Sequence, residues 1–344
     1  MLSLMVAGGV ALWLAGLLTP VLMRRLREAQ IGQHIREDGP SHHAMKAGTP
    51  TMGGVVIVIA VIAGFAFGHL GTHVGFTRAG ILTCGAIVAF GLIGFLDDII
   101  KVRNQRSLGL NKRAKSSLQL AFGVAYAVLA VTWVHTQTTL SATRFSLPGW
   151  QLGAVGWSIF AVLVLVGSSN AVNLTDGLDG LAAGSSTFCF AVLAIMGYWE
   201  FRHFAIYHGG SALDLGLTSV ALAGACLGFL WWNAAPAKIY MGDTGSLAIG
   251  AGLASLCLLM NVDLLLVVIG GLFVIETLSV IIQVFSYRLF KRRVFKMAPI
   301  HHHFELLGWP ETTVIVRFWI LAGLLAALGL GLFYADFLRV SPGV

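Results

Sequence analysis

The stretch AGILTCGAIVAFGLIGFLD, residues 79–97, decides the fold class of this 344-residue chain. It holds only small or apolar side chains until its last residue, Asp97, and its length is close to the roughly 20 residues that cross a bilayer as a helix. The rest of the chain is similar, since 57% of its residues are hydrophobic and only 11% are charged. This composition excludes an ordinary water-soluble domain. It also excludes a transmembrane β-barrel, whose strands alternate polar and apolar residues.

Further apolar windows predict about ten transmembrane helices. They cover residues 2–22, 53–69, 79–97, 117–135, 152–168, 180–197, 215–232, 245–260, 263–287 and 312–334. These windows use almost the whole chain, so we expect one all-α, polytopic integral membrane domain over residues 1–344. The first window is too long for a signal peptide and lacks a small-residue cleavage site, which favours a retained span.

The distribution of positive charge predicts the direction of the helices. Most of the 22 lysines and arginines lie in connections that follow odd-numbered predicted helices, whereas the opposite connections and the C-terminus hold Arg78, Arg144, Arg202 and Arg339. By the positive-inside rule, the side rich in lysine and arginine is cytoplasmic. Both termini and the 136–151 loop are then extracytoplasmic, and any site among the positive loops faces the cytoplasm.

Two kinds of function receive little support from the sequence. The four cysteines, Cys84, Cys189, Cys226 and Cys257, lie singly in predicted helices without a CxxC pair, so we expect small buried side chains and no metal or redox centre. The basic loops lack interleaved aromatic residues, so we expect them to meet lipid headgroups and phosphates and not nucleic acid.

Adjacent acidic residues end the third predicted helix. GFLDDIIK, residues 94–101, contains Asp97, Asp98 and Lys101. Such a group could simply cap a solvated helix end, with the lysine as a salt-bridge partner. However, carboxylates at the C-terminal end of a helix oppose its dipole, which favours a function or a bound cation. Neighbouring helix residues point about 100° apart, so we expect the two carboxylates to do different jobs.

Four oxygen-bearing side chains recur every third residue in NAVNLTDGLDGLAAG, residues 170–184. They are Asn170, Asn173, Asp176 and Asp179. The spacing fits a polar stripe on a helix, or a glycine-containing loop that enters the sixth helix. Asp176 alone could be a helix N-cap, but capping does not explain all four, and we expect their oxygens to converge.

A glycine-flanked acid precedes the eighth predicted helix. In NAAPAKIYMGDTGSLAIG, residues 233–250, Asp243 and Thr244 lie between Gly242 and Gly245. At a helix N-terminus, backbone amides and a carboxylate can reach a phosphate and its metal. The alternative is an ordinary capped helix start after a proline turn.

Polar residues also mark the ninth predicted helix, where Glu276, Ser279, Gln283 and Ser286 share one face. That face lines protein or water and not lipid, and a hydrogen-bond network and a substrate groove fit it equally well.

Three consecutive histidines, His301, His302 and His303, follow the basic run KRRVFK in MAPIHHHFELLG, residues 297–308. Zinc ligands are usually separated in sequence, so we expect anion recognition among neighbouring cations and not a zinc site. Inconsequential surface histidines are the alternative.

Taken together, these residues offer carboxylate and amide oxygens without cysteine, next to lysines and histidines. A few hard oxygen ligands suit Mg²⁺ completed by substrate phosphates. Transfer between two phosphate-bearing substrates is opposed by charge repulsion, which a metal and positioned cations offset. The residues therefore predict Mg²⁺-dependent chemistry on a lipid phosphate, a nucleotide or both, at the membrane surface.

Together with KAGTPTMGG, residues 46–54, the motifs at 94–101, 170–184, 233–250 and 297–308 resemble the phospho-N-acetylmuramoyl-pentapeptide transferase family, within the polyprenyl-phosphate N-acetylhexosamine-1-phosphate transferases. The resemblance implies transfer of phospho-MurNAc-pentapeptide from UDP-MurNAc-pentapeptide to undecaprenyl phosphate, which gives lipid I and UMP in peptidoglycan synthesis. It also implies Mg²⁺, a bacterial plasma membrane and a homodimer. The triple histidine, with PI before it and FE after it, favours this branch.

The resemblance also assigns residues. Asp243 would ligate Mg²⁺, with Asp97 and Asp98 nearby to deprotonate or orient the lipid phosphate, and Lys115 would neutralise phosphate. From their position among cations, we expect His301, His302 and His303 to recognise the phosphosugar or orient its phosphates. The substrate-binding set would be Lys46, Asn170, Asn173, Asp176, Gly177, Leu178, Asp179, Asn233 and Gln283, together with Tyr240. Tyr240 would stack on uracil, where many members have phenylalanine.

Two alternatives stay open at this point. One is a UDP-GlcNAc:polyprenyl-phosphate GlcNAc-1-phosphate transferase of the same superfamily. The other is a flippase or transporter of lipid-linked sugars, which should carry polar groups along a whole pathway and not at one end.

Overall fold

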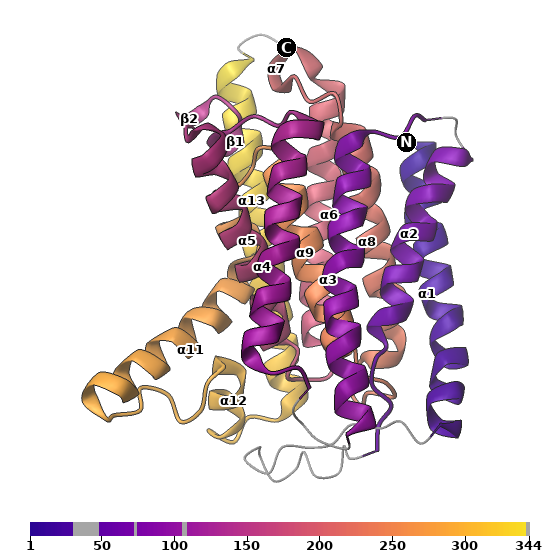
Figure 1. Ribbon diagram of the computed structural model, residues 1–344, viewed down its shortest axis with the longest axis vertical. Coiled ribbons are helices and arrows are strands. Elements are labelled where there is room, and N and C mark those ends of the chain that lie inside the picture. The colour runs from indigo at the N-terminus through magenta and orange to yellow at the C-terminus, as the bar shows by residue number, and fades with distance from the viewer. Residues whose placement is uncertain (30–47, 72–73, 105–108, 342–344) are drawn as a thin grey trace.

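Long apolar helices form most of the chain, in the order that the sequence predicts (Figure 1). The computed structural model describes residues 1–29, 48–71, 74–104 and 109–341. The helices are α1 (Leu2–Glu28), α2 (Gly54–Leu70), α3 (Arg78–Arg103), α4 (Lys112–Leu129) with the π-helical turn η2 (Ala130–Val134), α5 (Gly153–Thr175), α6 (Leu181–Arg202), α7 (Phe204–Tyr207), α8 (Ala212–Asn233), α9 (Gly242–Leu259), α10 (Leu266–Ile269), α11 (Gly271–Phe290), α12 (Ile300–Glu305) and α13 (Glu311–Val340).

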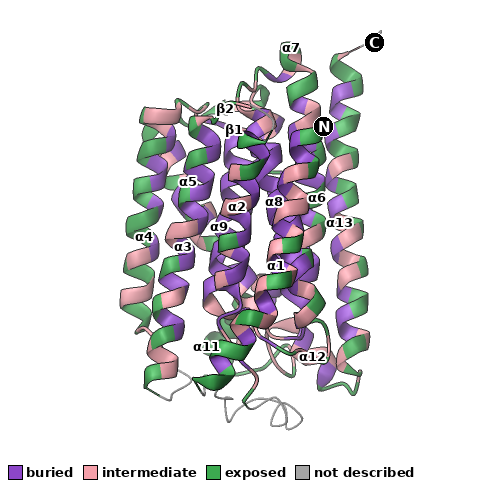
Figure 2. Ribbon diagram, turned by 90° about the vertical axis from the view of Figure 1, so that its right-hand side faces the viewer, coloured by how far each residue is buried: buried purple, intermediate pink, exposed green. Residues whose placement is uncertain are grey.

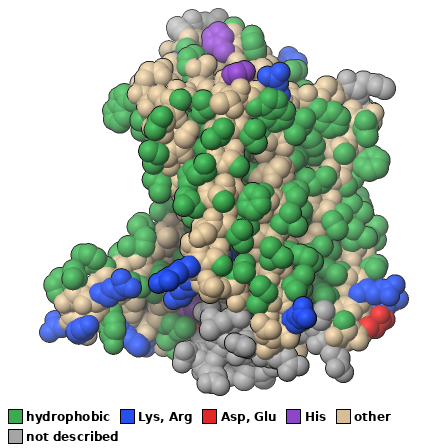
Figure 3. Space-filling view, in the orientation of Figure 1, with side chains coloured by type: hydrophobic (Ala, Val, Ile, Leu, Met, Phe, Trp, Pro, Cys, Tyr) green, Lys and Arg blue, Asp and Glu red, His purple; other side chains and the backbone are tan. Residues whose placement is uncertain are grey.

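Nine of the described helices are long and apolar enough to cross a membrane, and the 17-residue α2 is a shorter apolar helix. The prediction of an all-α, multi-pass membrane protein is confirmed. The beginning of α1 and the end of α13 lie at the same end of the bundle (Figure 1). Lysine and arginine side chains gather toward the opposite end and on the projecting α11 (Figure 3).

The ninth predicted helix differs from the expectation. Residues 263–287 do not form one continuous helix, because the chain breaks at Gly270 into the short α10 and the longer α11. The adjacent Gly270 and Gly271 weaken helix continuity at this point. Beyond the break, α11 leans out of the bundle, and α12 lies beneath it (Figure 1).

The predicted 136–151 loop also contains regular structure. Two antiparallel strands, β1 (Thr139–Arg144) and β2 (Leu147–Gln151), form a hairpin there. Alternate residues of β1 are buried, and the hairpin is tied to the helices because the Ser141 amide donates to Asp263 and the Thr143 hydroxyl donates to Asp336. The alternation of polar residues in this short segment is the pattern of a half-buried strand.

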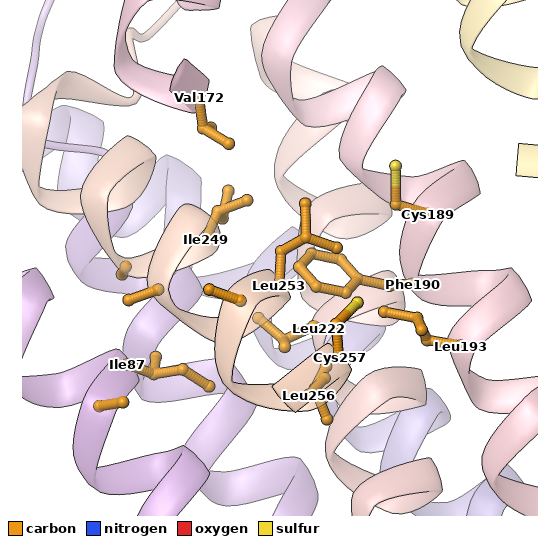
Figure 4. Packing of buried hydrophobic residues seen from close by; sticks show 14 of the residues in the cluster. Ile87, Val172, Cys189, Phe190, Leu193, Leu222, Ile249, Leu253, Leu256 and Cys257 are labelled. Atoms are coloured by element: carbon orange, nitrogen blue, oxygen red, sulfur yellow. The ribbon is translucent and has the colours of Figure 1, made fainter. Parts of the chain in front are cut away.

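α9 is the centre of the bundle. Its residues Ile249, Leu253, Leu256 and Cys257 are fully buried and face side chains from α3, α5, α6 and α8 (Figure 4). The surrounding helices bury their inner faces and expose their outer faces (Figure 2). Cys84, Cys189, Cys226 and Cys257 are buried and free, as expected.

Glycines bring the start of α9 against its neighbours. A Cβ at Gly94 of α3 would overlap the backbone carbonyl of Asp243, and a Cβ at Gly54 of α2 would overlap the backbone of Gly245. Gly242 has φ +73°, a conformation that glycine adopts without strain. These contacts fix the backbone of Asp243 beside the last turns of α3.

Candidate active site

The end of α3 and the start of α9 bring three carboxylates together. Asp97, Asp98 and Asp243 each offer an oxygen within 4.8 Å of the others, and this is the one such group of potential metal ligands among the described residues. Asp97 and Asp98 are each 2% exposed. The oxygens that the sequence places in separate motifs therefore converge at one end of the bundle.

Asp98 binds the first turn of α9. Its Oδ1 accepts a hydrogen bond from the amide of Asp243 at 3.1 Å, and its Oδ2 accepts from the amide of Thr244 at 3.0 Å and from the Thr244 hydroxyl at 2.7 Å. The amides at a helix N-terminus lack partners within the helix and carry partial positive charge. Asp98 thus caps α9 from another helix.

Asp97 has different partners. Its Oδ1 accepts a hydrogen bond from the Leu110 amide at 2.9 Å, and its Oδ2 lies 2.7 Å from Nζ of Lys101. The expectation that the adjacent aspartates do different jobs agrees with this division, since Asp98 holds backbone and Asp97 faces a cation.

Two lysines neutralise the cluster. Lys101 Nζ lies 3.0 Å from Asp243 Oδ1 and 3.6 Å from Asp98 Oδ1, and Lys115 of α4 forms an ion pair with Asp243 Oδ2. The sequence predicts Lys115 as a site residue and Lys101 only as a salt-bridge partner at the end of the helix. Lys101 lies four residues after Asp97 and three residues after Asp98, and this helical spacing is the sequence signal that Lys101 belongs to the site.

α5 joins the cluster through Asn173. Its Nδ2 donates to Asp243 Oδ1 at 3.1 Å and to Ser246 Oγ at 2.8 Å. Asn170, one turn earlier, instead donates to Gln119 Oε1 at 3.1 Å. Asn170 and Asn173 of the predicted polar stripe therefore lie on α5, which ends at Thr175. Asp176 and Asp179 lie in the turn before α6.

The turn between α5 and α6 holds the two remaining acids of the stripe. Removal from water and the negative charges of Asp243 and Asp98 raise the pKa of Asp176 to about 8. Asp179 is buried, and its Oδ2 accepts a hydrogen bond from the Ala237 amide at 2.9 Å. The side chain of Leu178 packs in an apolar cluster with Val314 of α13.

The connection between α8 and α9 lies beside this turn. Asn233 is 2% exposed, and its Nδ2 donates to the carbonyl of Ile239 at 2.9 Å. Tyr240 is partly buried, and its backbone bonds to Pro50 and Gly53 of the segment before α2. The backbone here is thus tied to the described end of the 46–54 motif, whereas Lys46 lies outside the described residues.

The histidines do not share one environment. His301 Nδ1 lies 3.1 Å from Glu276 Oε1, His302 Nδ1 lies 2.6 Å from Glu305 Oε2, and His303 Nδ1 accepts from the Lys296 amide at 3.1 Å. The expectation that cations surround the three imidazoles is wrong for His301 and His302, because the fold brings glutamates to them from α11 and α12.

The polar face of α11 lines protein, as expected. Gln283 Nε2 donates to the carbonyl of Phe295, and its Oε1 accepts from the amides of Val294 and Phe295, each at 3.0 Å. Ser286 donates to the carbonyl of Arg292 at 2.9 Å. These bonds fold the returning segment back along α11 toward α12.

The carboxylate cluster suits a hard divalent cation. Its donors are carboxylate oxygens without sulfur or imidazole, which is the ligand type that such cations prefer. Two lysines already supply positive charge to it. The site therefore combines oxygens of the kind that ligate a divalent cation with lysines that can contact phosphate.

Comparison with known proteins agrees with this geometry. Residues 79–261 match the family model described as glycosyl transferase family 4, and residues 46–58 match signature 1 of phospho-N-acetylmuramoyl-pentapeptide-transferase. Proteins named phospho-N-acetylmuramoyl-pentapeptide-transferase are similar over nearly the full length. That of Frankia casuarinae is 51% identical over 100% of both chains. That of Saccharopolyspora erythraea is 48% identical over 99% of both, and that of Streptomyces coelicolor is 45% identical over 97% of this chain and 98% of its own. The chain therefore belongs to the phospho-N-acetylmuramoyl-pentapeptide-transferase family.

Proposed function

We propose that this protein transfers phospho-MurNAc-pentapeptide from UDP-MurNAc-pentapeptide to undecaprenyl phosphate, giving lipid I and UMP in peptidoglycan synthesis. The observation that carries the proposal is the cluster of Asp97, Asp98 and Asp243 with Lys101 and Lys115 at one end of the bundle. Membership of the family supplies the substrate class. A transporter of lipid-linked sugars fits less well, because it would need polar groups along a whole pathway.

Mg²⁺ is the cofactor that we propose for the cluster, with Asp243 as a ligand and Asp97 as a neighbouring oxygen donor. When bound there, the ion would offset the negative charge of the two substrate phosphates. The carboxylate oxygens of Asp243 and Asp97 fit such an ion by their chemistry, while Asp98 holds the start of α9 beside them.

The lysines and aspartates have separable roles in the proposed reaction. Lys101 and Lys115 contact Asp243 from two sides and would neutralise phosphate oxygens as the substrates approach. Asp97 would orient or deprotonate the lipid phosphate. Asp98 would hold the backbone of Asp243 in place, since both of its oxygens accept hydrogen bonds from amides at the start of α9. We favour direct attack of the lipid phosphate on the sugar-linked phosphorus, with UMP as the leaving group.

The nucleoside pocket that we propose lies between the α5–α6 turn and the α8–α9 connection. Tyr240 would stack on uracil, and Asn173, Asp176 and Asp179 would supply polar contacts. Gly177, Leu178, Asn233, Gln283, Lys46 and Asn170 complete the proposed set. His302 and His303, which are partly exposed, would contact the phosphosugar.

We further propose that residues 1–344 form one integral membrane domain of the bacterial plasma membrane and that the protein acts as a homodimer. Both termini and the β1–β2 hairpin would then be extracytoplasmic, and the carboxylate cluster would face the cytoplasm. The excess of lysine and arginine in the connections on the cluster's side supports this orientation.

The test is incubation of the purified protein with UDP-MurNAc-pentapeptide, undecaprenyl phosphate and Mg²⁺. We expect release of UMP that requires both substrates and stops when Mg²⁺ is chelated. Replacing the nucleotide sugar with UDP-GlcNAc separates the two branches of the superfamily. UMP release with UDP-GlcNAc but not with UDP-MurNAc-pentapeptide would assign the protein to the other branch. Release of UMP from neither nucleotide sugar would contradict a transferase.

A further inference from the structure

A buried glutamate–histidine pair joins α11 to α12. Glu276 Oε1 lies 3.1 Å from His301 Nδ1, and both side chains are 0% exposed. Neither Glu276 Oε2 nor His301 Nε2 has a hydrogen-bond partner among the described residues. The hydrogen bond between them is therefore the one that each side chain makes within the described part of the chain. Breaking it would leave two buried polar side chains without any hydrogen-bond partner there, which is costly in free energy. The pair is therefore a strong local constraint on where the imidazole lies.

The other edge of that imidazole meets the α5–α6 turn. A Cβ built at Gly177 would overlap Nε2 of His301 and lie 3.0 Å from its Cε1. The ring therefore rests against the backbone of Gly177, and only a residue without a side chain fits there. Because His301 is enclosed between Glu276 and this turn, its imidazole is not open to a substrate.

The turn beneath the imidazole carries two acids of the proposed nucleoside pocket. Asp176 precedes Gly177, and its carboxyl feels the negative charges of Asp243 and Asp98. Asp179 follows and binds the α8–α9 connection through the Ala237 amide. A shift of Gly177 by a few tenths of an ångström would move both carboxylates relative to the metal-binding cluster.

We propose that Glu276 is a positioning residue, which holds the imidazole of His301 against Gly177 and thereby fixes the turn that carries Asp176 and Asp179. The inference rests on the proposed function, because it treats this turn as part of the nucleotide pocket. Glu276 acts through His301 and the turn, and it contacts no substrate. His301 acts by packing and hydrogen bonding and not as an acid or base.

Substitutions at Glu276 separate positioning from acid–base chemistry. Glu276→Gln keeps the side-chain length and an acceptor oxygen for His301, so we expect the affinity for UMP and the KM for UDP-MurNAc-pentapeptide to stay within about twofold of wild type. Glu276→Asp is one methylene shorter and cannot reach, so we expect affinity to fall about tenfold, as in Glu276→Ala. If Glu276 were an acid or base, Asp would preserve turnover and Gln would abolish it, which would overturn the proposal.

A second pair of variants tests the contact with Gly177. Gly177→Ala should weaken UMP binding in the wild-type background, because the new methyl group meets the imidazole. In the His301→Ala background that space is empty, so the same substitution should cost little more than His301→Ala alone. Gly85→Ala is the matched control, since nothing lies within 4 Å of a Cβ at that position of α3. Additive losses from Gly177→Ala and His301→Ala would contradict the contact.

Amide hydrogen exchange gives a readout that does not depend on activity. Exchange of residues 176–180 should accelerate in Glu276→Ala and Glu276→Asp, and remain as in wild type in Glu276→Gln, with thermal unfolding as the check on the whole fold. A wild-type protein that releases no UMP would contradict the proposed function only. Unchanged exchange in Glu276→Ala would contradict this inference only.

Discussion

Asp98 on α3 accepts a hydrogen bond from the backbone amide of Asp243 on α9, at 3.1 Å. The acid that we propose as the metal ligand is therefore held through its own backbone by a second acid of the cluster. Asp98 also accepts from the amide and hydroxyl of Thr244, so its two oxygens are committed to the start of α9. This bond separates the roles of the three carboxylates.

Asp98→Ala should destabilise the protein and also reduce turnover. The substitution removes the acceptor for two amides at the N-terminus of α9 and for the hydroxyl of Thr244. Leaving a buried donor unsatisfied costs about 1–3 kcal/mol of folding free energy. Thermal unfolding in detergent checks this. Asp97→Ala is the comparison, because the Asp97 carboxylate accepts from the Leu110 amide and pairs with Lys101, whereas the amides at the start of α9 bind Asp98. Equal stability of Asp98→Ala and wild type would contradict the capping role.

Lys101→Met should separate metal binding from turnover. Lys101 Nζ lies 2.7 Å from Asp97 and 3.0 Å from Asp243, so its charge opposes a divalent cation in the cluster while it assists an approaching phosphate. We expect tighter binding of Mn²⁺, used as a spectroscopic probe, together with a kcat at least about tenfold lower. Lys112→Met, at an exposed position of α4, is the control. Weaker Mn²⁺ binding in Lys101→Met would argue that the lysine does not compete with the metal.

Tyr240→Phe should leave UMP affinity nearly unchanged, whereas Tyr240→Ala should weaken it by about tenfold. Base stacking needs the aromatic ring and not the hydroxyl, and it contributes about 1–3 kcal/mol. Calorimetric titration with UMP measures both variants. An alanine variant that binds UMP as tightly as wild type would move the uracil away from Tyr240.

The binding of UMP should weaken as the pH rises through about 8. Burial and neighbouring acids raise the pKa of Asp176 to about 8, so its carboxyl is neutral below that pH and becomes negative above it, where it repels an anionic nucleotide. The stability of the folded protein should also fall as the pH rises. A carboxyl whose pKa is higher in the folded than in the unfolded state stabilises the fold most at low pH, and this stabilisation is lost as the pH rises through the folded-state pKa. Asp176→Asn should remove this part of the pH dependence. A pH profile identical in wild type and Asp176→Asn would exclude Asp176 as its source.

The helices could be predicted from the sequence because about 20 apolar residues in a row have few other stable arrangements. The break at Gly270 could not, since a glycine pair inside an apolar run is common in transmembrane helices. Convergence of Asp97 with Asp243 was predictable through resemblance, but the bonds from Asp98 to the amides of α9 depend on how closely Gly94 lets the two helices approach.

The environment of the histidines shows the same limit. His301 and Glu276 are 25 residues apart in sequence, and their pairing depends on the way the segment after α11 folds back toward the bundle. The sequence neighbours of the histidines are lysines and arginines, whereas in space His301 and His302 lie beside the carboxylates of Glu276 and Glu305. Charge patterns along the chain therefore do not predict the partners of a single side chain.

The central claim, that the carboxylate cluster transfers a phosphosugar to a lipid phosphate, is tested most directly by comparing wild type with Asp243→Asn in one measurement. Purified protein is given UDP-MurNAc-pentapeptide, undecaprenyl phosphate and Mg²⁺, and lipid I and UMP are quantified by mass spectrometry. Wild type should form both in equal amounts, and well-folded Asp243→Asn should be slower by more than about a hundredfold, because it lacks a charged metal ligand. Turnover by folded Asp243→Asn close to that of wild type, or UMP without lipid I in wild type, would contradict the account.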